Sequence, residues 1–257
     1  MIKIGTPSYL NTKIISYPIE RKKVVLQSSM LIEDVPSRLG TMLENGEIDL
    51  GLVSTGIMTE DLIIAPTISI SGPGKVESVI LFSNRKLQDE SEWNLGLSKD
   101  SYTANMLAMM LCKERYSNGA RFVLDGRTDA RVMIGDNALR QLREKGHWKY
   151  VIDLAKEWYD WTRLPMVFAV LVSKRKSASI IKAARGIVRA KEWGLKHIPE
   201  IARASKPDFM SIKETERYIR NIDYSLGEKH IESIIRFMTV MQKHGYTDRA
   251  FSRRRLW

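Results

Sequence analysis

The sequence predicts an α/β protein with two lobes and a ligand-binding cleft between them. Short apolar, β-branched segments alternate with segments of helical periodicity, which is typical of a mostly parallel sheet covered by helices. Two strong strands, at 77–83 and 166–173, bracket a middle segment that has its own alternation of strands and helices. The chain would therefore leave one lobe through the first of these strands and return through the second.

The N-terminal segment predicts three strands. Residues 2–8 read as a short apolar strand ending in Pro and Ser, and a short helix or turn leads from it to Pro18. The β-branched run at 23–30 fits a second strand. Residues 37–46 have helical periodicity and end in a glycine suited to a helix C-terminus. The segment 48–55 is nearly all apolar, as in a strand buried on both faces.

The rest of the chain continues the alternation and then becomes helical. Further strands are predicted over 77–83, 93–98, 120–125 and 166–173, with a helix over 101–116, a strand running into a loop over 130–139, and helices over 177–244. We therefore expect residues 1–82 and 175–257 to form the first lobe and residues 83–174 the second. Ligands of open α/β sheets bind beyond the carboxyl ends of the strands, so those ends would face each other across the cleft.

The chain is basic, with a net charge of +11, and three interpretations compete. A nucleic-acid-binding protein would gather this charge on one face, whereas an enzyme for anionic substrates would gain a faster encounter from it. A solvated basic surface is the third. The basic residues are spread along the chain, apart from a dense run at 253–255, and no zinc-finger spacing or RNA-recognition motif accompanies them. We expect no nucleic-acid partner.

Other features of the sequence indicate a cytoplasmic protein with no membrane partner. No stretch has the length and apolar character of a spanning helix, and the strand-like N-terminus lacks the pattern of a secretory signal. Cys112 is the single cysteine and lies in an apolar run, which predicts a buried side chain rather than a nucleophile. The sequence leaves the oligomeric state open, a homodimer included.

The familiar catalytic signatures are missing from this chain. It has no glycine-rich dinucleotide loop and no phosphate-binding loop, and its four histidines lack metal-ligand spacing. We therefore expect no cofactor and no metal ion. An enzyme with this sequence would work with small polar side chains and backbone donors.

Small polar residues cluster where the predicted strands meet the cleft. Each alone is more often a turn or cap residue, but their coincidence at cleft-facing ends makes them candidate ligand contacts. The candidate substrate-binding residues are Ser8, Ser54, Thr55, Ser101, Thr103 and Asp136, and Asn11 and Ser78 are the candidate catalytic residues.

Ser101 and Thr103 stand at a predicted helix N-terminus, where free backbone N–H groups and the helix dipole favour an anion such as a carboxylate. The alternative is that one of them only caps the helix. Asp136 would repel a carboxylate ligand, so it is expected to orient donors or to tether a loop. The aromatic cluster around Trp158 and Trp161 fits either an interlobe core or a cleft wall.

Several motifs occur in a consistent order along almost the whole chain. They are SYLN at 8–11, VPSRLGTMLENGEIDLGLVS at 35–54, VESVILFS at 76–83, IGDNAL at 134–139, DLAKEWYDWTRLPMVFAV at 153–170 and YIRNIDYSL at 218–226. Together they resemble the chorismate dehydratase family of the futalosine route to menaquinone. The N-terminal TPSYLN does not match the SPCPND-type motif of the sister enzyme, dihydroxynaphthoate synthase.

The resemblance implies a periplasmic-binding-protein-like (type II) fold. It also implies removal of water from chorismate, which gives 3-[(1-carboxyvinyl)oxy]benzoate without a cofactor. By similarity, Asn11 and Ser78 would lie against the substrate, and Ser54, Ser101 and Thr103 would hold its carboxylates. No protein base is evident in the sequence, so our hypothesis is that the enolpyruvyl carboxylate of the substrate accepts the ring proton.

Two segments depart from the family pattern. Arg163 stands where the family has a glycine in a T-G-L-P turn, and residues 71–75 read SGPGK in place of an Arg-Gly-Pro sequence. Both segments lie near the predicted hinge, and they leave a divergent paralogue for another small carboxylate open. A non-catalytic binding module with the same cleft is a further alternative, and formation of product from chorismate distinguishes it from the enzyme.

Overall fold

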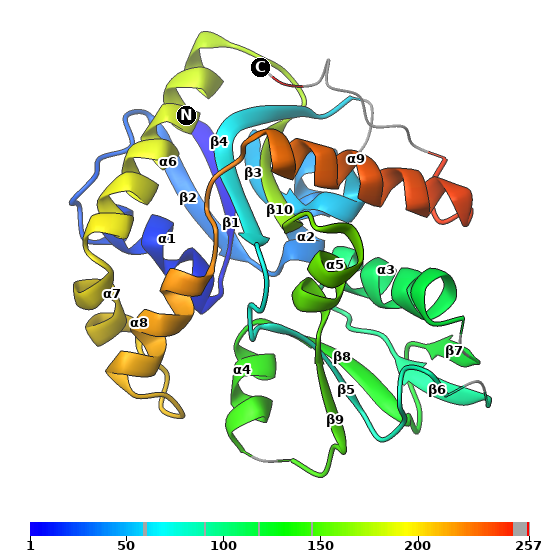
Figure 1. Ribbon diagram of the computed structural model, residues 1–257. Helices are drawn as coiled ribbons and strands as arrows, with labels where there is room; N and C mark the ends of the chain where they lie inside the picture. The colour runs from blue at the N-terminus through cyan, green and yellow to red at the C-terminus, as the bar shows by residue number, and fades with distance from the viewer. Residues whose placement is uncertain (59–60, 90, 118, 145, 249–255, 257) are drawn as a thin grey trace.

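Two five-stranded sheets, each covered by helices, form the two lobes of the molecule (Figure 1). The computed structural model describes residues 1–58, 61–89, 91–117, 119–144, 146–248 and 256. The predicted two-lobed α/β architecture is confirmed. No helix within these ranges is both long enough and apolar enough to cross a membrane.

The first sheet has the strand order β2-β1-β3-β10-β4. Its strands are β1 (Ile2–Pro7), β2 (Ser29–Asp34), β3 (Leu50–Ser54), β4 (Ile63–Gly72) and β10 (Met166–Ser173). β1 is parallel to β2 and β3, whereas β10 runs antiparallel to β3 and β4. Helices cover both faces of the sheet, with α1 (Lys13–Glu20) and α6 (Ala178–Lys196) on one side and α9 (Glu228–Lys243) on the other (Figure 1). All of β3 is therefore buried, as its apolar sequence predicts.

The second sheet has the strand order β7-β6-β8-β5-β9. Its strands are β5 (Val79–Ser83), β6 (Trp93–Gly96), β7 (Ala120–Val123), β8 (Ala130–Ile134) and β9 (Tyr150–Asp153). β6 is parallel to β7 and β8, and β5 is antiparallel to β8 and β9. The helices of this part of the chain are α3 (Tyr102–Met110), α4 (Gly135–Arg143) and α5 (Leu154–Thr162). Cys112, in the π-helical turn after α3, is buried as predicted.

The predicted lobe boundaries are wrong by one strand at each crossing. β5 pairs with β8 and β9 and so belongs to the second sheet, whereas β10 pairs with β3 and β4 and belongs to the first. The chain therefore crosses between the lobes through 73–78 and 163–165, ahead of each strand. Both strands are apolar and buried, so their composition could not show which sheet they join.

Three local predictions also differ from the structure. The second strand lies at 29–34 rather than 23–30; in the predicted strand Val24 and Leu26 pack against the core, but Val25 is 66% exposed. The segment after β8 is the helix α4 rather than a loop. The edge strand β4 and the pair β9–α5 were not predicted at all.

The C-terminal part is helical, as predicted, and comprises α6, α7 (Ile198–Ser205), α8 (Ile212–Asn221) and α9. α5 packs against α9 through Trp158, whose indole N–H donates to Ser233 Oγ over 2.9 Å and whose ring meets Phe237 edge-on. Trp158 is fully buried, so the aromatic cluster is core rather than cleft wall. α5 ends at Arg163, which takes a left-handed conformation with φ of 61°.

Candidate functional site

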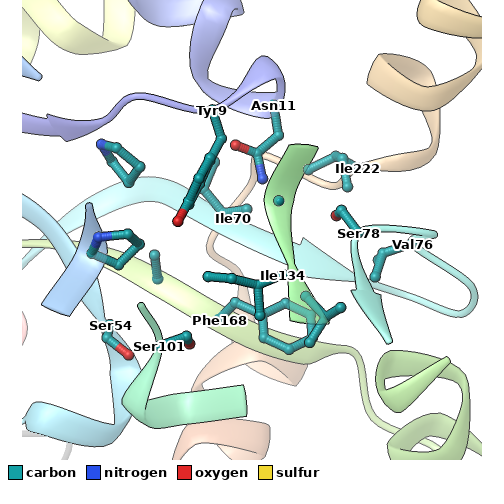
Figure 2. A pocket seen from close by; sticks show the side chains of 15 residues that line it. Tyr9, Asn11, Ser54, Ile70, Val76, Ser78, Ser101, Ile134, Phe168 and Ile222 are labelled. Atoms are coloured by element: carbon teal, nitrogen blue, oxygen red, sulfur yellow. The ribbon is translucent and has the colours of Figure 1, made fainter. Parts of the chain in front are cut away.

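A cavity opens between the two lobes (Figure 2). It is lined mainly by apolar side chains, with a few hydroxyl and amide groups among them. The lining residues are Pro7, Tyr9, Asn11, Pro36, Ser54, Ile70, Val76, Ser78, Val79, Ser101, Ile134, Gly135, Phe168, Ala169 and Ile222. This composition is typical of a small-molecule site, where few polar groups orient a ligand among many apolar contacts.

Four of the predicted site residues meet in this cavity. Asn11 follows β1, Ser54 ends β3, Ser78 precedes β5 and Ser101 stands before α3. Asn11 and Ser78 approach from one side of the space, and Ser54 and Ser101 lie together at another (Figure 2). Residues that are far apart in the sequence thus converge because strand ends of both sheets face the cleft.

Thr103 lies behind the cavity wall, where it supports Ser54. The two hydroxyl oxygens are 2.5 Å apart, and the backbone N–H of Thr103 donates to Ser54 Oγ over 3.2 Å. Thr103 Oγ1 also accepts from the backbone N–H of Gly56 over 2.9 Å. Thr103 therefore links α3 to the end of β3 and fixes the position of the Ser54 hydroxyl.

Ser101 both caps α3 and lines the cavity. Its hydroxyl oxygen accepts a hydrogen bond from the backbone N–H of Ala104 over 3.2 Å, which is the geometry of an N-cap. The capping interpretation is thus confirmed for Ser101. Its contact with an anion stays a prediction.

Asp136 tethers a loop, as predicted, and does not line the cavity. Its Oδ1 accepts from the backbone N–H of Leu10 over 3.1 Å, which connects α4 of the second lobe to the segment after β1 in the first. Burial raises the pKa of this carboxyl, and the Leu10 N–H and the Lys13 ammonium oppose that rise. The adjacent Gly135 has φ of 59°, and a Cβ there would lie 2.7 Å from the ring of Tyr9, so the two lobes touch closely at this point.

Ser8 and Thr55 do not reach the cavity. Ser8 is exposed, and its backbone N–H donates to the carbonyl of Asp34 over 3.1 Å. Thr55 is fully buried next to Ser54, and its hydroxyl has no hydrogen-bond partner within the described part of the chain. Both were predicted because they follow strands at cleft-facing ends, but position along the chain does not show toward which side a side chain points.

Tyr9 was not chosen as a site residue, although it stands in the SYLN segment next to Asn11. Among the described residues, neither the Tyr9 hydroxyl nor Asn11 Oδ1 has a hydrogen-bond partner, and both atoms are buried. Burial, then the nearby Asp100 and Asp136, raise the pKa of the Tyr9 phenol, so it stays a protonated donor. Buried polar atoms of this kind are suited to bind polar groups of a ligand.

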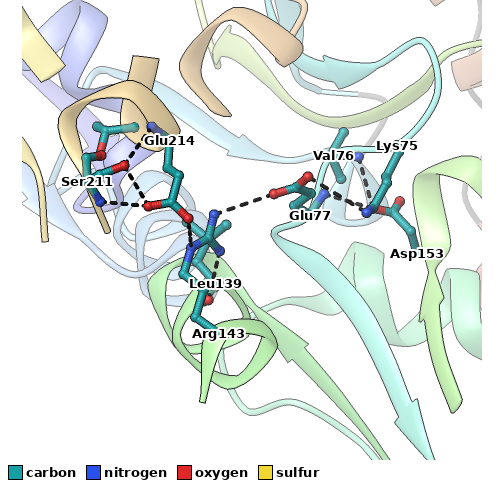
Figure 3. A network of polar contacts seen from close by, with 9 residues as sticks. Lys75, Val76, Glu77, Leu139, Arg143, Asp153, Ser211 and Glu214 are labelled. Carbon is teal, nitrogen blue, oxygen red and sulfur yellow. Dashed lines mark hydrogen bonds and ion pairs between the residues drawn. The ribbon is translucent and has the colours of Figure 1, made fainter. Parts of the chain in front are cut away.

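Ser78 is positioned by the segment that crosses from β4 to β5, and Val76 and Glu77 of that segment are drawn in Figure 3. The Oδ2 atom of Asp153, at the start of α5, accepts hydrogen bonds from the backbone N–H of Val76 over 3.0 Å and of Glu77 over 2.7 Å. The carbonyl of Ser78 in turn accepts from the N–H of Gly135 over 2.7 Å. The crossing segment and the start of α4 therefore hold Ser78 at the cavity from both sides.

Arg143 joins three parts of the molecule beside this segment (Figure 3). Its guanidinium lies 3.5 Å from Glu77 Oε2 in the crossing segment and 3.7 Å from Glu214 Oε1 in α8. A third contact is its donation to the carbonyl of Leu139 over 2.9 Å. Arg143 and Glu77 are each only 15% exposed, so the pair is poorly screened by solvent.

Three helices begin at the cavity. Pro36 is the first residue of α2 (Pro36–Glu44), Ser101 is the N-cap of α3, and Gly135 is the first residue of α4. Helix N-termini carry a partial positive charge, because the peptide dipoles of the helix add up along its axis. No Lys, Arg or His is among the described residues that line the cavity. The positive ends of helices, together with hydroxyl groups, therefore provide the electrostatic environment, which suits a small anion.

The two sheets with a ligand cavity between them define a two-lobed fold of the periplasmic-binding-protein type. A crystal structure of a protein from Archaeoglobus fulgidus has the same fold, with a TM-score of 0.75, 14% sequence identity and coverage of 96% of this chain and 98% of that one. The alkanesulfonate-binding protein of Xanthomonas axonopodis pv. citri also shares it, with a TM-score of 0.64, 14% identity and coverage of 100% and 97%. The predicted type II fold is confirmed by these likenesses.

The chain belongs to the menaquinone biosynthesis family, whose model matches residues 2–243. A relative from Thermus thermophilus, named chorismate dehydratase, is 27% identical over 225 residues, which cover 78% of this chain and 80% of the relative. Family membership agrees with the resemblance found in the ordered motifs.

Proposed function

We propose that this protein is a chorismate dehydratase, a carbon–oxygen lyase that removes water from chorismate to give 3-[(1-carboxyvinyl)oxy]benzoate in menaquinone biosynthesis. The family of the chain and the name of its Thermus thermophilus relative support this activity. The observation that carries the proposal is the cavity itself, where three helix N-termini meet hydroxyl groups on an otherwise apolar wall. Chorismate is a small dicarboxylate with an apolar ring, and it matches that pattern.

Ser54 and Ser101 are suited to one carboxylate of the substrate. Their hydroxyls lie on the cavity wall at the N-terminus of α3, where the helix dipole adds to the hydrogen bonds. The Ser54 hydroxyl is held by Thr103, so little motion has to be suppressed on binding. Thr103 supports the carboxylate site from behind instead of touching the ligand.

Asn11 and Ser78 are suited to the reacting part of the substrate. In the reaction one ring C–H bond and one ring C–O bond break, the ring becomes aromatic, and the departing hydroxide is protonated to water. An amide and a hydroxyl fixed on the cavity wall can stabilise the charge that develops on the leaving oxygen and on the ring system. The aromaticity of the product supplies much of the driving force, so positioning is the main task of the protein.

The ring proton needs an acceptor, and the cavity wall offers no carboxylate, imidazole or amine for it among the described residues. Among the described lining residues, Tyr9 alone has an ionisable side chain, and its raised pKa keeps it protonated. We therefore assign the base to the enolpyruvyl carboxylate of chorismate itself. This group is held close to the ring by the substrate's own covalent structure.

Incubation of the purified protein with chorismate tests the proposal directly. The expected result is a product lighter by one water, with the absorbance of a substituted benzoate, formed without any added cofactor. Protein that is folded by circular dichroism and yet forms no such product would contradict the activity. Thermal stabilisation by chorismate without turnover would instead indicate a binding protein with the same cleft.

A further inference from the structure

Tyr218 is buried next to the candidate site, but it is not one of the residues that line the cavity. It lies in α8, one helical turn before Ile222, and Ile222 lines the cavity, so both residues are on the same face of the helix. The Tyr218 side chain is only 1% exposed. Its hydroxyl is buried and has no hydrogen-bond partner among the described residues, and the Ser78 hydroxyl is near enough to lower the pKa of the phenol.

The Tyr218 oxygen contributes nothing evident to the stability of the fold. Within the described part of the chain it has no hydrogen-bond partner, and burying a hydroxyl without a partner destabilises the folded state. A phenylalanine would keep the ring packing without this cost. The oxygen is therefore more readily explained by the chemistry next to it than by packing.

The surroundings keep the Tyr218 phenol protonated. Burial raises its pKa, the neighbouring Ser78 hydroxyl lowers it, and the negative charges of Asp136 and Glu77 raise it further. A protonated phenol has one O–H to donate, and Ser78 has an oxygen that can accept it. Catalytic hydrogen bonds are often long in the free enzyme and tighten when substrate binds, so the present geometry is compatible with such a bond.

We propose that Tyr218 is a positioning residue that donates a hydrogen bond to Ser78 Oγ in the substrate complex and so directs the Ser78 O–H toward the leaving oxygen. This inference rests on the proposed dehydratase function. A fixed donor stabilises developing charge better than a rotating one, because it needs no reorganisation during the reaction. Tyr218 acts through Ser78 and does not itself touch the substrate.

The Tyr218→Phe variant tests the inference. We expect kcat for chorismate to fall by about tenfold to a hundredfold, with KM changed by less than about threefold, because the interaction operates mainly in the transition state. The thermal unfolding midpoint should be unchanged or higher, since an unpaired buried hydroxyl is removed. Tyr246→Phe is the matched control, because the Tyr246 hydroxyl is also buried without a partner in the described chain, but the Tyr246 ring packs against His244 and Lys113. It should leave kcat unchanged.

A double-mutant cycle shows whether Tyr218 acts through Ser78. With enzyme in excess and product followed by mass spectrometry, Tyr218→Phe should have little further effect in a Ser78→Ala background. The inference would be overturned by an unchanged kcat for Tyr218→Phe. It would also be overturned if the reduction in turnover of the double variant equalled the product of the reductions of the two single variants. Neither result would affect the proposed dehydratase function. Failure of the wild-type protein to convert chorismate would overturn the proposed function, and this inference with it.

Discussion

The carboxylate of Asp136 accepts a hydrogen bond from the backbone N–H of Leu10 over 3.1 Å, and this bond joins the two lobes beside the cavity. Asp136 stands in the first turn of α4, and Leu10 stands between Tyr9 and Asn11, two residues of the cavity wall. The bond therefore couples the approach of the lobes to the placement of both cavity side chains. Removing it should affect both stability and substrate binding.

We expect Asp136→Ala to lower the free energy of unfolding by about 1–3 kcal/mol, because the Leu10 N–H loses its partner in a partly buried place. KM for chorismate should rise, since Tyr9 and Asn11 are held less firmly. Asp136→Asn keeps an acceptor oxygen, and without the burial cost of a charge it should be at least as stable as the wild type at pH 7. Urea unfolding and steady-state kinetics measure these effects. Equal stability of the wild type and Asp136→Ala would contradict the assigned role.

Arg143→Met should lower the free energy of unfolding by about 2 kcal/mol, because the largely buried charge of Glu77 then keeps only the exposed Lys75 ammonium as a cationic partner. The crossing segment that carries Ser78 should also become more mobile, which hydrogen exchange at 76–80 would report. Arg38→Met is the control, since Arg38 pairs with Asp34 at the surface and is 70% exposed, and such pairs contribute less than about 1 kcal/mol. Similar losses for the two variants would argue against a special role for Arg143.

Asn11→Ala and Ser78→Ala should each lower kcat for chorismate by about a hundredfold or more, the usual cost of losing a transition-state donor. Neither variant should lose much stability, because Asn11 Oδ1 has no hydrogen-bond partner in the described chain and Ser78 is tied to its neighbours through its backbone. Ser8→Ala is the matched control, since Ser8 is exposed and outside the cavity, and its kcat should equal that of the wild type. Near-normal turnover by both test variants would show that the reaction takes place elsewhere.

Acid should destabilise the protein through Asp223. Burial raises the pKa of this carboxyl, but hydrogen bonds from His230 and Ser225 outweigh burial and lower it from 3.8 to about 2. A folded-state pKa below the unfolded value gives stability that is present above about pH 4 and is lost as the pH falls toward 2. We expect Asp223→Asn to be less stable than the wild type at pH 6 by about 1–2 kcal/mol, allowing for partial solvent screening, and to lose less on acidification. Urea unfolding at pH 6 and pH 3 measures the free energy of unfolding of both proteins. Equal losses of this free energy between pH 6 and pH 3 in the wild type and in Asp223→Asn would contradict the role assigned to Asp223.

Arg163 takes a left-handed conformation at the end of α5, with φ of 61°. Non-glycine residues pay about 1–2 kcal/mol for this conformation, and glycine avoids that cost but loses more chain entropy on folding. We therefore expect Arg163→Gly to raise the free energy of unfolding by about 0.5 kcal/mol and Arg163→Val to lower it by more than 1 kcal/mol, roughly. Thermal unfolding of the two variants and the wild type measures these effects. A valine variant more stable than the wild type would contradict the prediction.

Much of the fold could be predicted because strands and helices here follow local patterns. The apolar run at 50–54 is a strand buried on both faces, and the end of the preceding helix at Gly46, with φ of 74°, follows from glycine's freedom there. The second strand was misplaced, because β-branched residues at Val24 and Val25 suggest a strand and burial alone decides whether one forms. Local pattern likewise cannot show which sheet an apolar strand joins.

The sequence by itself determined the alternation of strands and helices, the helical C-terminal part, the family and four residues of the cavity wall: Asn11, Ser54, Ser78 and Ser101. These follow from local patterning and from motifs, which a chain carries in any conformation. The tertiary structure alone decided that Thr103 supports Ser54 from behind and that the Tyr218 hydroxyl is buried close enough to Ser78 to be influenced by it. Such residues are 49 or more positions apart in the sequence, and only the packing of the two lobes brings the hydroxyls of Ser54 and Thr103 to 2.5 Å.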